Sequence, residues 1–436
     1  MKSKRQTDSG LATYFPKGKF AARRVAEVLQ KEHLFATVDR QLHRYEGGVW
    51  RNDGEEAIAV PIQNILGDRW TIHYQDEVVE FLRVRSKVAA FKSHDHLINT
   101  KDGMLDPITR DILPHDPSYD SVYQVPISYQ QDIPGSLAEF YVRSVLPENT
   151  TPVFWEYIAS CFIQRDYWPK SFLVLQGQSD TGKSKLLEWV RGIFGEENCT
   201  SLTLHSIADN RFSRHQLYHR IANIGSDLDS GMVKDIGLIK SLTGGDTIVA
   251  EEKGKPMYQF SNRARFFFST NIFPSLRDTD EAFFKRILLI PCTNEFNQQQ
   301  NEFYQQWYGS DILYQSALHC ICEGYQRLIA QQALSESATI MVARAHLSSL
   351  ADTVIAFLMS CEANQEACVP QNVMYQWYRR FCEMEGAQAV SGAVFYRKMA
   401  EAIKQSFYGV SMVRPRTGEE MTRPRHYKGL KPCDMP

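Results

Sequence analysis

The chain has 436 residues, a length that corresponds to roughly three domains of about 150 residues each. With 43% hydrophobic and 23% charged residues, its composition is that of a globular protein and excludes fibrous and globally disordered classes. The net charge of −2, from 49 basic and 51 acidic side chains, excludes a uniformly basic nucleic-acid coat but leaves room for a local basic face. No apolar run approaches the roughly 18 residues that cross a bilayer, so no membrane partner is expected.

The cysteines indicate the redox environment of the chain. Nine of them are scattered from Cys161 to Cys433, and no CxxC pair occurs. An odd number without metal-ligand spacing predicts reduced thiols in a cytosol-like compartment. His319, Cys320 and Cys322 come closest to a metal cluster, but their spacing matches no common zinc site, so we expect them in a buried helix.

Periodicity and turn signals predict elements of different type along the chain. An amphipathic helix and a short hairpin are followed by further helix and then by a turn-rich stretch typical of a small β-rich connector. Helices come next, and beyond them short apolar runs alternate with helices, as in a parallel α/β sheet. These elements are predicted over residues 21–31 (helix), 42–50 (hairpin), 98–129 (connector), 136–165 (helices), 171–291 (α/β sheet), and 304–332 and 340–361 (helices).

The same changes in character predict five segments. The first residues are polar and without periodicity, so we expect a frayed start. The remaining boundaries follow the turn-rich connector, the end of the α/β region and a compositional change near the carboxyl end. The segments are a flexible tail (1–18), an N-terminal helical and β connector domain (19–134), an α/β domain (135–300), a helical segment (301–365) and a basic C-terminal domain (366–436).

A phosphate-binding loop is the strongest motif of the sequence. Residues 177–184 match G-x-x-x-x-G-K-[ST] and lie between a strand-like run and a helix-like run. Glycines let backbone N–H groups converge on phosphates, and the following helix adds its positive end. The motif predicts binding of ATP with Mg²⁺, which Ser184 would help to hold. Its nucleotide-binding residues are Gly177, Gln178, Ser179, Asp180, Thr181, Gly182, Lys183 and Ser184.

Polar residues at the ends of two later strands are candidates for the chemistry. Asp227 follows the apolar run 221–225 and is our choice for the carboxylate that activates water or binds Mg²⁺, with Asp229 as the alternative. Either residue could instead cap the next helix. Asn271 ends the run 265–270, where an amide can orient a water against the γ-phosphate, although Asn also closes strands for turn reasons.

A basic pair precedes the last predicted strand of the sheet. Arg286 could neutralise the charge that develops during phosphoryl transfer. Alternatively, Lys285 and Arg286 form an ordinary solvated pair beside the strand 287–290.

The order of these motifs resembles superfamily 3 helicases, which are hexameric AAA+ motors of viruses, phages and plasmids. The similarity is strongest to the helicase part of phage, plasmid and poxvirus primase-helicases. It covers about residues 20–300, with a connector similar to 99–129 of this chain. The segments that carry it are Leu242-Thr243-Gly244-Gly245-Asp246-Thr247-Ile248, Ser269-Thr270-Asn271-Ile272-Phe273-Pro274 and Asp280-Glu281-Ala282-Phe283-Phe284-Lys285-Arg286.

The resemblance implies a fold, an activity and residue roles. The fold would be an α/β AAA+ P-loop parallel-sheet ATPase core, and the activity ATP-dependent unwinding by a hexameric ring that moves 3′→5′ on single-stranded and forked DNA. Lys183 and Ser184 would bind phosphate and Mg²⁺, and Asp227 would be the acid of the second motif. Asn271 would be the polar sensor, and Arg286 the finger that reaches the ATP of a neighbouring subunit.

The family's DNA-tracking hairpin corresponds to the stretch between Ile248 and Phe260. Lys253 and Lys255 would contact DNA there, and the intervening glycine allows a tight tip. Glu251 and Glu252 stand where relatives commonly carry basic residues, which weakens the positive charge of the hairpin. The alternative is a solvated turn without DNA contact.

Ser226 stands where many relatives carry a first acid, so the metal site is expected to rest on Asp227.

The resemblance also implies partners and a source. The residues before Phe20 are too few for a primase domain, so we expect priming by a separately encoded primase. A phage, plasmid or mobile-element replication system places the chain in the cytoplasm of a prokaryotic host cell.

The carboxyl-terminal stretch is locally basic. From Ser391 onward, nine Lys or Arg residues stand against four acids, which gives a charge of about +5. Helices followed by a hairpin predict a winged-helix-like domain. Arg414 and Arg416 would share one strand face and Arg423 and Arg425 the next, a basic face suited to a phosphate backbone. A charged hairpin without a partner is the alternative.

Three functions compete at this point. The first is an ATP-driven DNA helicase, and the second is a replication initiator whose ATP site switches assembly without strong unwinding. The third, a P-loop kinase of small molecules, is disfavoured because the sequence has no recognisable acceptor lid and such an enzyme needs no basic tail.

Overall fold

The computed structural model describes residues 11–38, 41–86, 88, 91, 96–163, 169–228, 236–251, 253–254, 257–273, 281–294, 298–384, 389–404, 411–413 and 426–432. The chain divides into two compact units, one comprising Met1–Pro274 with Arg286–Ile340 and the other Ser275–Lys285 with Met341–Pro436. The finer domain boundaries expected from the sequence stay predictions. None of the described helices is long and apolar enough to span a bilayer.

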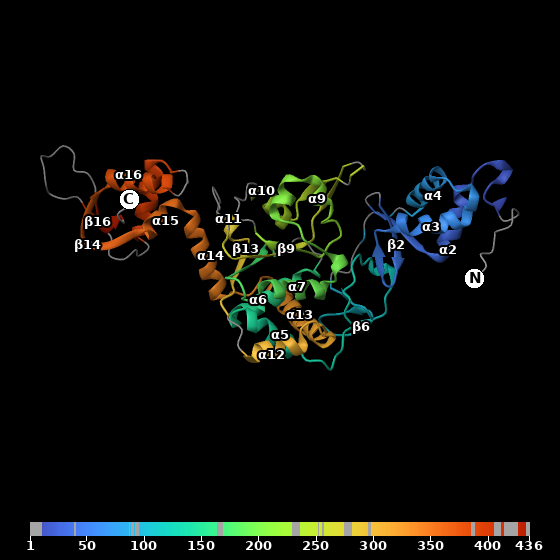
Figure 1. The fold of residues 1–436 in the computed structure, drawn as a ribbon, viewed down its shortest axis with the longest axis horizontal. Coiled ribbons are helices and arrows are strands. Elements are labelled where there is room, and N and C mark those ends of the chain that lie inside the picture. Colours follow the sequence, from blue (N-terminus) through green and yellow to red (C-terminus); the bar gives the residue numbers. More distant parts are fainter. Residues whose placement is uncertain are drawn as a thin grey trace. The chain divides into compact units, whose positions relative to one another are not determined.

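The first unit begins with a small layer of helices and antiparallel strands (Figure 1). Gly47 and Gly48 form the two-residue turn of the predicted hairpin, with φ of 59° and 92°, values that favour glycine. A Cβ on Gly48 would lie 2.5 Å from the ring of His115, so the turn also needs glycine for close packing. The elements are α2 (Ala22–Glu32), β1 (Leu34–Val38), β2 (Gln41–Glu46), β3 (Val49–Arg51), α3 (Gly54–Leu66) and α4 (Ile72–Arg85).

The predicted β-rich connector follows as a three-stranded sheet of β4 (Ile98–Asn99), β5 (Met104–Leu105) and β6 (Ile112–Leu113). Buried Asn99 joins it to the preceding layer, because its amide nitrogen donates to the carbonyl oxygen of Gly48 at 2.9 Å. The His115 ring lies 3.0 Å from the amide oxygen of the same side chain. The turn between β2 and β3 is therefore held against the connector.

A five-stranded parallel sheet forms the centre of this unit, as the alternating pattern predicted (Figure 1). Its strand order is β13-β7-β12-β9-β8, so β7 lies between β13 and β12. All four neighbouring pairs are parallel. The strands are β7 (Phe172–Gln176), β8 (Cys199–Thr200), β9 (Ala222–Asp227), β12 (Arg265–Thr270) and β13 (Ile287–Pro291).

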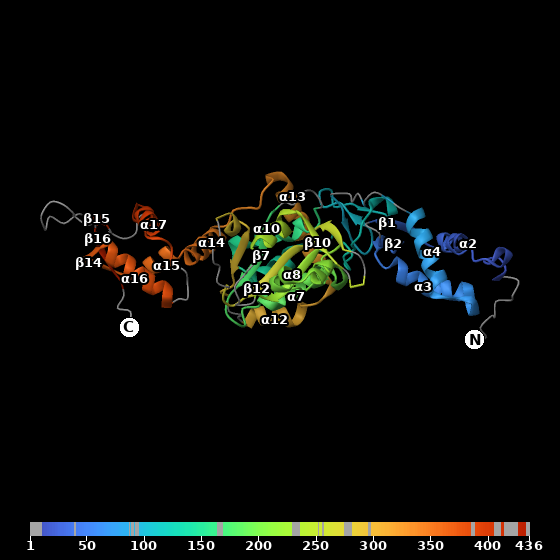
Figure 2. The same cartoon turned by 90° about the horizontal axis from the view of Figure 1, so that it is seen from above.

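Helices cover one face of this sheet with a large apolar core (Figures 1 and 2). Leu173 and Leu175 of β7 belong to that core, whereas the alternate residues Phe172 and Val174 are buried outside it, as expected for side chains that alternate between two faces. The covering helices are α5 (Ser136–Val145), α6 (Thr151–Ser160), α7 (Lys183–Phe194) and α13 (Asp311–Gln331), with α12 (Gln298–Trp307) beside α5.

Further helices and strands lie between β8 and β12 in the sequence. Two short helices, α8 (Leu204–Asp209) and α9 (Arg211–His215), precede β9, and α10 (Ile236–Gly244) follows it. β10 (Thr247–Ala250) and β11 (Tyr258–Ser261) then pair antiparallel, with Ile248 opposite Phe260. The hairpin expected between these two residues is thus confirmed.

The candidate metal cluster lies inside helix α13, as the sequence predicted. His319, Cys320 and Cys322 are all buried there, the His319 ring lies 2.8 Å from the carbonyl oxygen of Gln130, and the Cys320 thiol contacts the carbonyl of Gly135. No group of three or more potential metal ligands occurs among the described residues.

The second unit has its own core and combines helices with a three-stranded sheet of order β14-β16-β15. Strand β14 was not predicted, whereas both tail helices and the terminal hairpin were. Lys398 donates to Asp352 at 2.7 Å, which neutralises one of the nine basic residues counted in the tail. The elements, besides α11 (Glu281–Phe284), are α15 (Thr353–Met359), β14 (Cys361–Pro370), α16 (Gln371–Met384), α17 (Gly392–Lys404), β15 (Ser411–Val413) and β16 (His426–Pro432), and α14 (Ala338–Ala351) runs across the boundary of the two units.

A buried carboxylate joins α6 to the residues that follow α13. Glu156 has no exposed side-chain surface and accepts hydrogen bonds from Arg327 at 3.0 Å and from the backbone and hydroxyl of Ser335, both at 2.7 Å. A buried charge is tolerated when it is paired and hydrogen-bonded in this way. Removal of one partner leaves the other polar groups buried without a hydrogen bond.

Replacing Glu156 with alanine should lower the free energy of unfolding by about 3 kcal/mol, because Arg327 and the Ser335 amide lose their acceptor. The shift in denaturant midpoint, followed by tryptophan fluorescence, measures this loss. The matched control is Glu148→Ala, which removes a carboxylate that is 76% exposed and should change stability by no more than about 0.5 kcal/mol. Equal shifts in the two variants would show that the Glu156 contacts contribute nothing.

Candidate active site

The carboxyl ends of three strands bring the predicted nucleotide residues to one edge of the central sheet. Gln176, the last residue of β7, is paired with Thr270 of β12 and with Pro291 of β13. Asp227, the last residue of β9, is paired with Ser269. The chain segments that start at Gly177, Leu228 and Asn271 therefore leave the sheet side by side.

The start of the phosphate loop is fixed by backbone contacts on both sides. The amide of Gly177 donates to the carbonyl of Thr270 at 3.1 Å, and the amide of Cys292 donates to the carbonyl of Gln176 at 2.6 Å. A Cβ on Gly177 would lie only 2.2 Å from the carbonyl oxygen of Cys292. Close approach of the chain after β13 thus requires glycine at the first position of the motif.

Lys183 occupies the interior of the loop. It is the first residue of α7, is only 6% exposed, and its Nζ donates to the carbonyls of Gly177 at 2.8 Å and Gln178 at 2.6 Å. Asp180 and Gly182 have φ of 65° and 80°, so the backbone curls around the ammonium group. Backbone amides of such a concave loop face a common centre, as an anion requires. The next residue, Ser184, is exposed at the start of α7.

The other two candidates at this edge are placed by their strands. Asn271 is exposed and directly follows Thr270, so it lies next to Gly177. Asp227 ends β9, two strands from the phosphate loop, and Leu228 donates its amide to Ser269 at 2.9 Å. Asp229 lies outside the described residues. The backbone order at this edge agrees with the predicted arrangement of acid and sensor around a phosphate, while their roles stay predictions.

Cys292 lies beside the loop and carries a buried thiol. Burial raises the pKa of its thiol to about 12, although the positive charge of Lys183 acts in the opposite direction. The thiol therefore stays protonated at neutral pH.

Arg286 lies where the strands of the sheet begin, whereas the phosphate loop lies where they end. Its carbonyl accepts from the amide of Phe172, the first residue of β7, whereas the loop follows the last residue of that strand. Four residues of extended strand span roughly 13 Å. The guanidinium of Arg286 donates to the carbonyl of Lys240 at 3.0 Å and to the hydroxyl of Thr243 at 2.8 Å, near the carboxyl end of α10.

The β10–β11 hairpin is attached to α9 by two side-chain contacts. Glu251 forms an ion pair with Arg211, and the His215 ring lies 2.7 Å from the hydroxyl of Tyr258. Lys253 is exposed at the tip next to Gly254, whose φ is 84°. Lys255 and Glu252 lie outside the described residues.

The ion pair changes what the sequence suggested about the hairpin. Glu251 was expected to weaken the positive charge presented to DNA, but Arg211 compensates its charge within the same unit. The charge at the described part of the tip is therefore that of Lys253.

The basic face predicted for the tail cannot be placed. Arg414, Arg416, Arg423 and Arg425 lie outside the described residues. On β16, Lys428 and Lys431 are exposed. A role of the tail in DNA binding stays a prediction.

Sequence reasoning missed the residues that position the candidates. Thr243 and Lys240 hold Arg286 from more than 40 positions away, and Arg211 holds Glu251 from 40 positions away. Each belongs to a segment with no spacing signal toward its partner. These contacts exist because non-consecutive elements meet in the fold.

Parts of the chain are similar in sequence to known families and to a viral protein. A family profile described as "Family of unknown function (DUF5906)" matches residues 175–286, and one described as "Poxvirus D5 protein-like" matches residues 350–427. The "Putative helicase L207/L206" of Acanthamoeba polyphaga mimivirus is 23% identical over 163 residues, which cover 36% of this chain and 17% of the viral protein. The chain thus spans a small part of the length of that relative.

A solved structure shares the fold over nearly the whole chain. The A form apo structure of the NrS-1 C terminal region covers 93% of this chain and 98% of its own, with a TM-score of 0.52 and 12% sequence identity. The chain is therefore similar in fold to that region, and in sequence to a putative viral helicase and a poxvirus D5-like segment.

Proposed function

We propose that the chain is an ATP-dependent DNA helicase of the superfamily 3 type, acting in the replication of a phage, plasmid or other mobile element in the cytoplasm of a prokaryotic cell. The observation that carries the proposal is the phosphate loop around Lys183, placed at the carboxyl end of β7, an inner strand of the parallel sheet. Similarity to a putative helicase and to a poxvirus D5-like segment supports it.

ATP is the proposed substrate and Mg²⁺ the proposed cofactor. The contacts that Lys183 makes to loop carbonyls are those that a β- or γ-phosphate would replace, so the loop fits a nucleoside triphosphate. Ser184 and Asp227 would hold Mg²⁺, which neutralises phosphate charge when bound. Asn271, next to Gly177, would orient the attacking water.

The position of Arg286 supports action between subunits. Since it lies a strand length from the phosphate loop of its own chain, its guanidinium is suited to the ATP of a neighbour. We propose a homo-oligomeric ring, most simply a hexamer, in which each ATP site is completed by the next subunit. Hydrolysis would then depend on assembly.

DNA contact is assigned to two surfaces. Lys253, with Lys255, would follow the single strand in the centre of the ring, where several weak contacts add along the strand. From Thr353 onward, the second unit has the element order helix, strand, two helices and two strands, and we propose that this part is a winged-helix-like domain whose basic segment binds DNA. Movement 3′→5′ on forked DNA and a separately encoded primase complete the proposal.

A replication initiator that uses ATP as an assembly switch is the alternative. The compact second unit with its own core favours this alternative, because a separate DNA-binding module suits origin recognition. Strand displacement on forked DNA distinguishes the two, since an initiator would hydrolyse ATP without displacing a strand.

Lys183→Ala should abolish ATP hydrolysis and weaken ATP binding at least tenfold, because Lys183 is the sole cation of the loop sequence 177–184. Phosphate release and nucleotide titration measure the two effects. Lys185→Ala is the matched control: Lys185 lies two residues further on, is 54% exposed and pairs with Glu188. A Lys183→Ala variant that hydrolyses ATP at the wild-type rate would exclude the phosphate loop as the active site.

Arg286→Ala should be inactive alone, and mixing it with inactive Lys183→Ala should restore part of the ATPase activity, because each kind of subunit supplies what the other lacks. Thr243→Val serves as control, since it removes one contact of Arg286 without removing the guanidinium. A folding defect at Arg286 would not be rescued by mixing. No recovery in mixed rings, with their composition verified by mass, would contradict action between subunits.

A further inference from the structure

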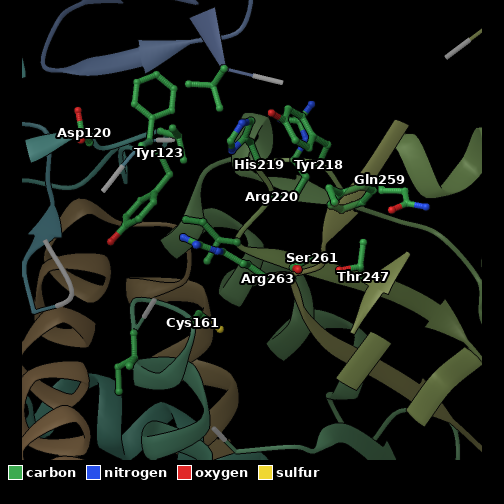
Figure 3. Close-up of a pocket in the computed structure, with 16 residues that line it drawn as sticks. Asp120, Tyr123, Cys161, Tyr218, His219, Arg220, Thr247, Gln259, Ser261 and Arg263 are labelled. Carbon is green, nitrogen blue, oxygen red and sulfur yellow. The ribbon is translucent and has the colours of Figure 1, made fainter. Parts of the chain in front are cut away.

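A second cavity lies in the first unit, away from the phosphate loop (Figure 3). It has a volume of about 330 Å³ and forms where the N-terminal layer, the connector, the loop before β9 and the β10–β11 hairpin meet. Ile221 precedes β9 and Arg263 lies two residues before β12, so the cavity is at the amino edge of these strands. The phosphate loop is at the carboxyl edge, and the two sites are therefore separate.

The charge around the cavity favours an anion. Arg220 and Arg263 both line it, and Asp120 is the single acid among its described lining residues. The pKa of His219 lies well below its usual value, first because of burial and then because of the positive fields of His43, Arg263 and Arg220. Two guanidinium groups and one carboxylate thus line the cavity, and Arg220 also donates to the carbonyl of Glu197.

Polar atoms at the cavity also have unused hydrogen-bonding capacity. Within the described structure, Nε2 of His219 and Nε of Arg220 are buried without a hydrogen-bond partner. His219 has a φ of 56°, a left-handed conformation that non-glycine residues adopt at a cost and that is frequent at ligand sites. Unsatisfied polar atoms and backbone strain at one point of the wall are both accounted for by a bound ligand.

Aromatic side chains, most of them largely buried, form much of the remaining wall. Phe91, Tyr123, Tyr218 and Phe260 line the cavity, and the rings of Tyr218 and Phe260 meet nearly edge to face, with centroids 5.5 Å apart. In Figure 3, Arg263 lies between Tyr123 and Ser261, within the same space that His219 borders. A volume near 330 Å³ is at the lower end for small-molecule sites and accommodates one base with its sugar phosphate, but no duplex.

We propose that this cavity binds one nucleotide unit of single-stranded DNA, with its phosphate at Arg220 and Arg263 and its base among Phe91, Tyr218 and Phe260. The inference rests on the proposed function, because it takes the ligand to be part of the strand that the motor follows. The hairpin contributes Phe260 to the wall, so an occupied cavity would hold the strand close to the base of the element that carries Lys253 at its tip.

Arg263→Gln tests the assignment in the full chain. Arg263 is exposed and lies between β11 and β12, so the substitution should leave the fold intact. Binding of a fluorescein-labelled oligothymidylate is measured by anisotropy over a range of salt concentrations. Arg23→Gln is the matched control, because it removes the same charge from a side chain that is 74% exposed on α2.

The expected result is a loss of affinity of about three- to tenfold for Arg263→Gln, with a salt slope lower by about 0.7, as for one lost phosphate contact on a single strand. Arg23→Gln should bind like wild type. Photo-cross-linking with a 5-iodouracil oligonucleotide should label the peptides that contain Tyr218 or Phe260.

Equal binding by the two variants, without cross-links at these peptides, would overturn the cavity assignment and leave the proposed function standing. If wild type binds no oligonucleotide, the proposed function fails, and titration with thymidine monophosphate decides the cavity. If thymidine monophosphate binds Lys183→Ala but not Arg263→Gln, the cavity binds a free nucleotide instead of a DNA strand. No binding of either probe would overturn both.

Discussion

Parallel pairing of β7 with β12 on one side and β13 on the other is the constraint on which the candidate site depends. Since all three strands run in the same direction, the segment that follows each of them emerges at one edge. That edge receives the phosphate loop, with Lys183 inside it, and Asn271. Arg286 lies at the opposite side of the sheet, where the strands begin. Arg263 and the second cavity lie on that same side, at the starts of β12 and β9. The backbone of Arg286 and the second cavity thus lie about the length of one strand from the phosphate loop.

Buried polar contacts keep this arrangement in register. The hydroxyl of Tyr157 lies 3.1 Å from the carbonyl of Ser171 and 3.0 Å from that of Phe266, so helix α6 holds the starts of β7 and β12 together. At the far ends, the amide of Gly177 donates to Thr270. Arg286 connects the start of β13 to α10, which leads into the β10–β11 hairpin. In the proposed ring, a change in the contacts of Arg286 would shift the carboxyl end of α10 and, with it, the start of the β10–β11 hairpin.

Local patterns were sufficient for much of this architecture, and long-range contacts were not predictable from them. The loop around Lys183 has a fixed spacing between a strand and a helix, so sequence alone located it. The hairpin was located between Ile248 and Phe260 by the family resemblance and by the strand-like runs that flank a glycine, whereas its register is seen only in the structure. In contrast, strand β14 (Cys361–Pro370) contains Glu, Asn and Gln instead of a regular apolar alternation, and its pairing with β16 sets its conformation. The contacts of Arg286 and the second cavity likewise arise where distant segments meet, which no spacing rule reveals.

The most direct test of the account is the rate of ATP hydrolysis by the wild-type chain, measured by phosphate release with and without single-stranded DNA. A DNA-tracking motor should show Mg²⁺-dependent hydrolysis that single-stranded DNA accelerates several-fold, because nucleotide turnover in such a motor depends on contact with the strand. A rate that DNA leaves unchanged would contradict the motor and favour an ATP-switched initiator. Absence of hydrolysis in both conditions would contradict the assignment of the phosphate loop as an active site.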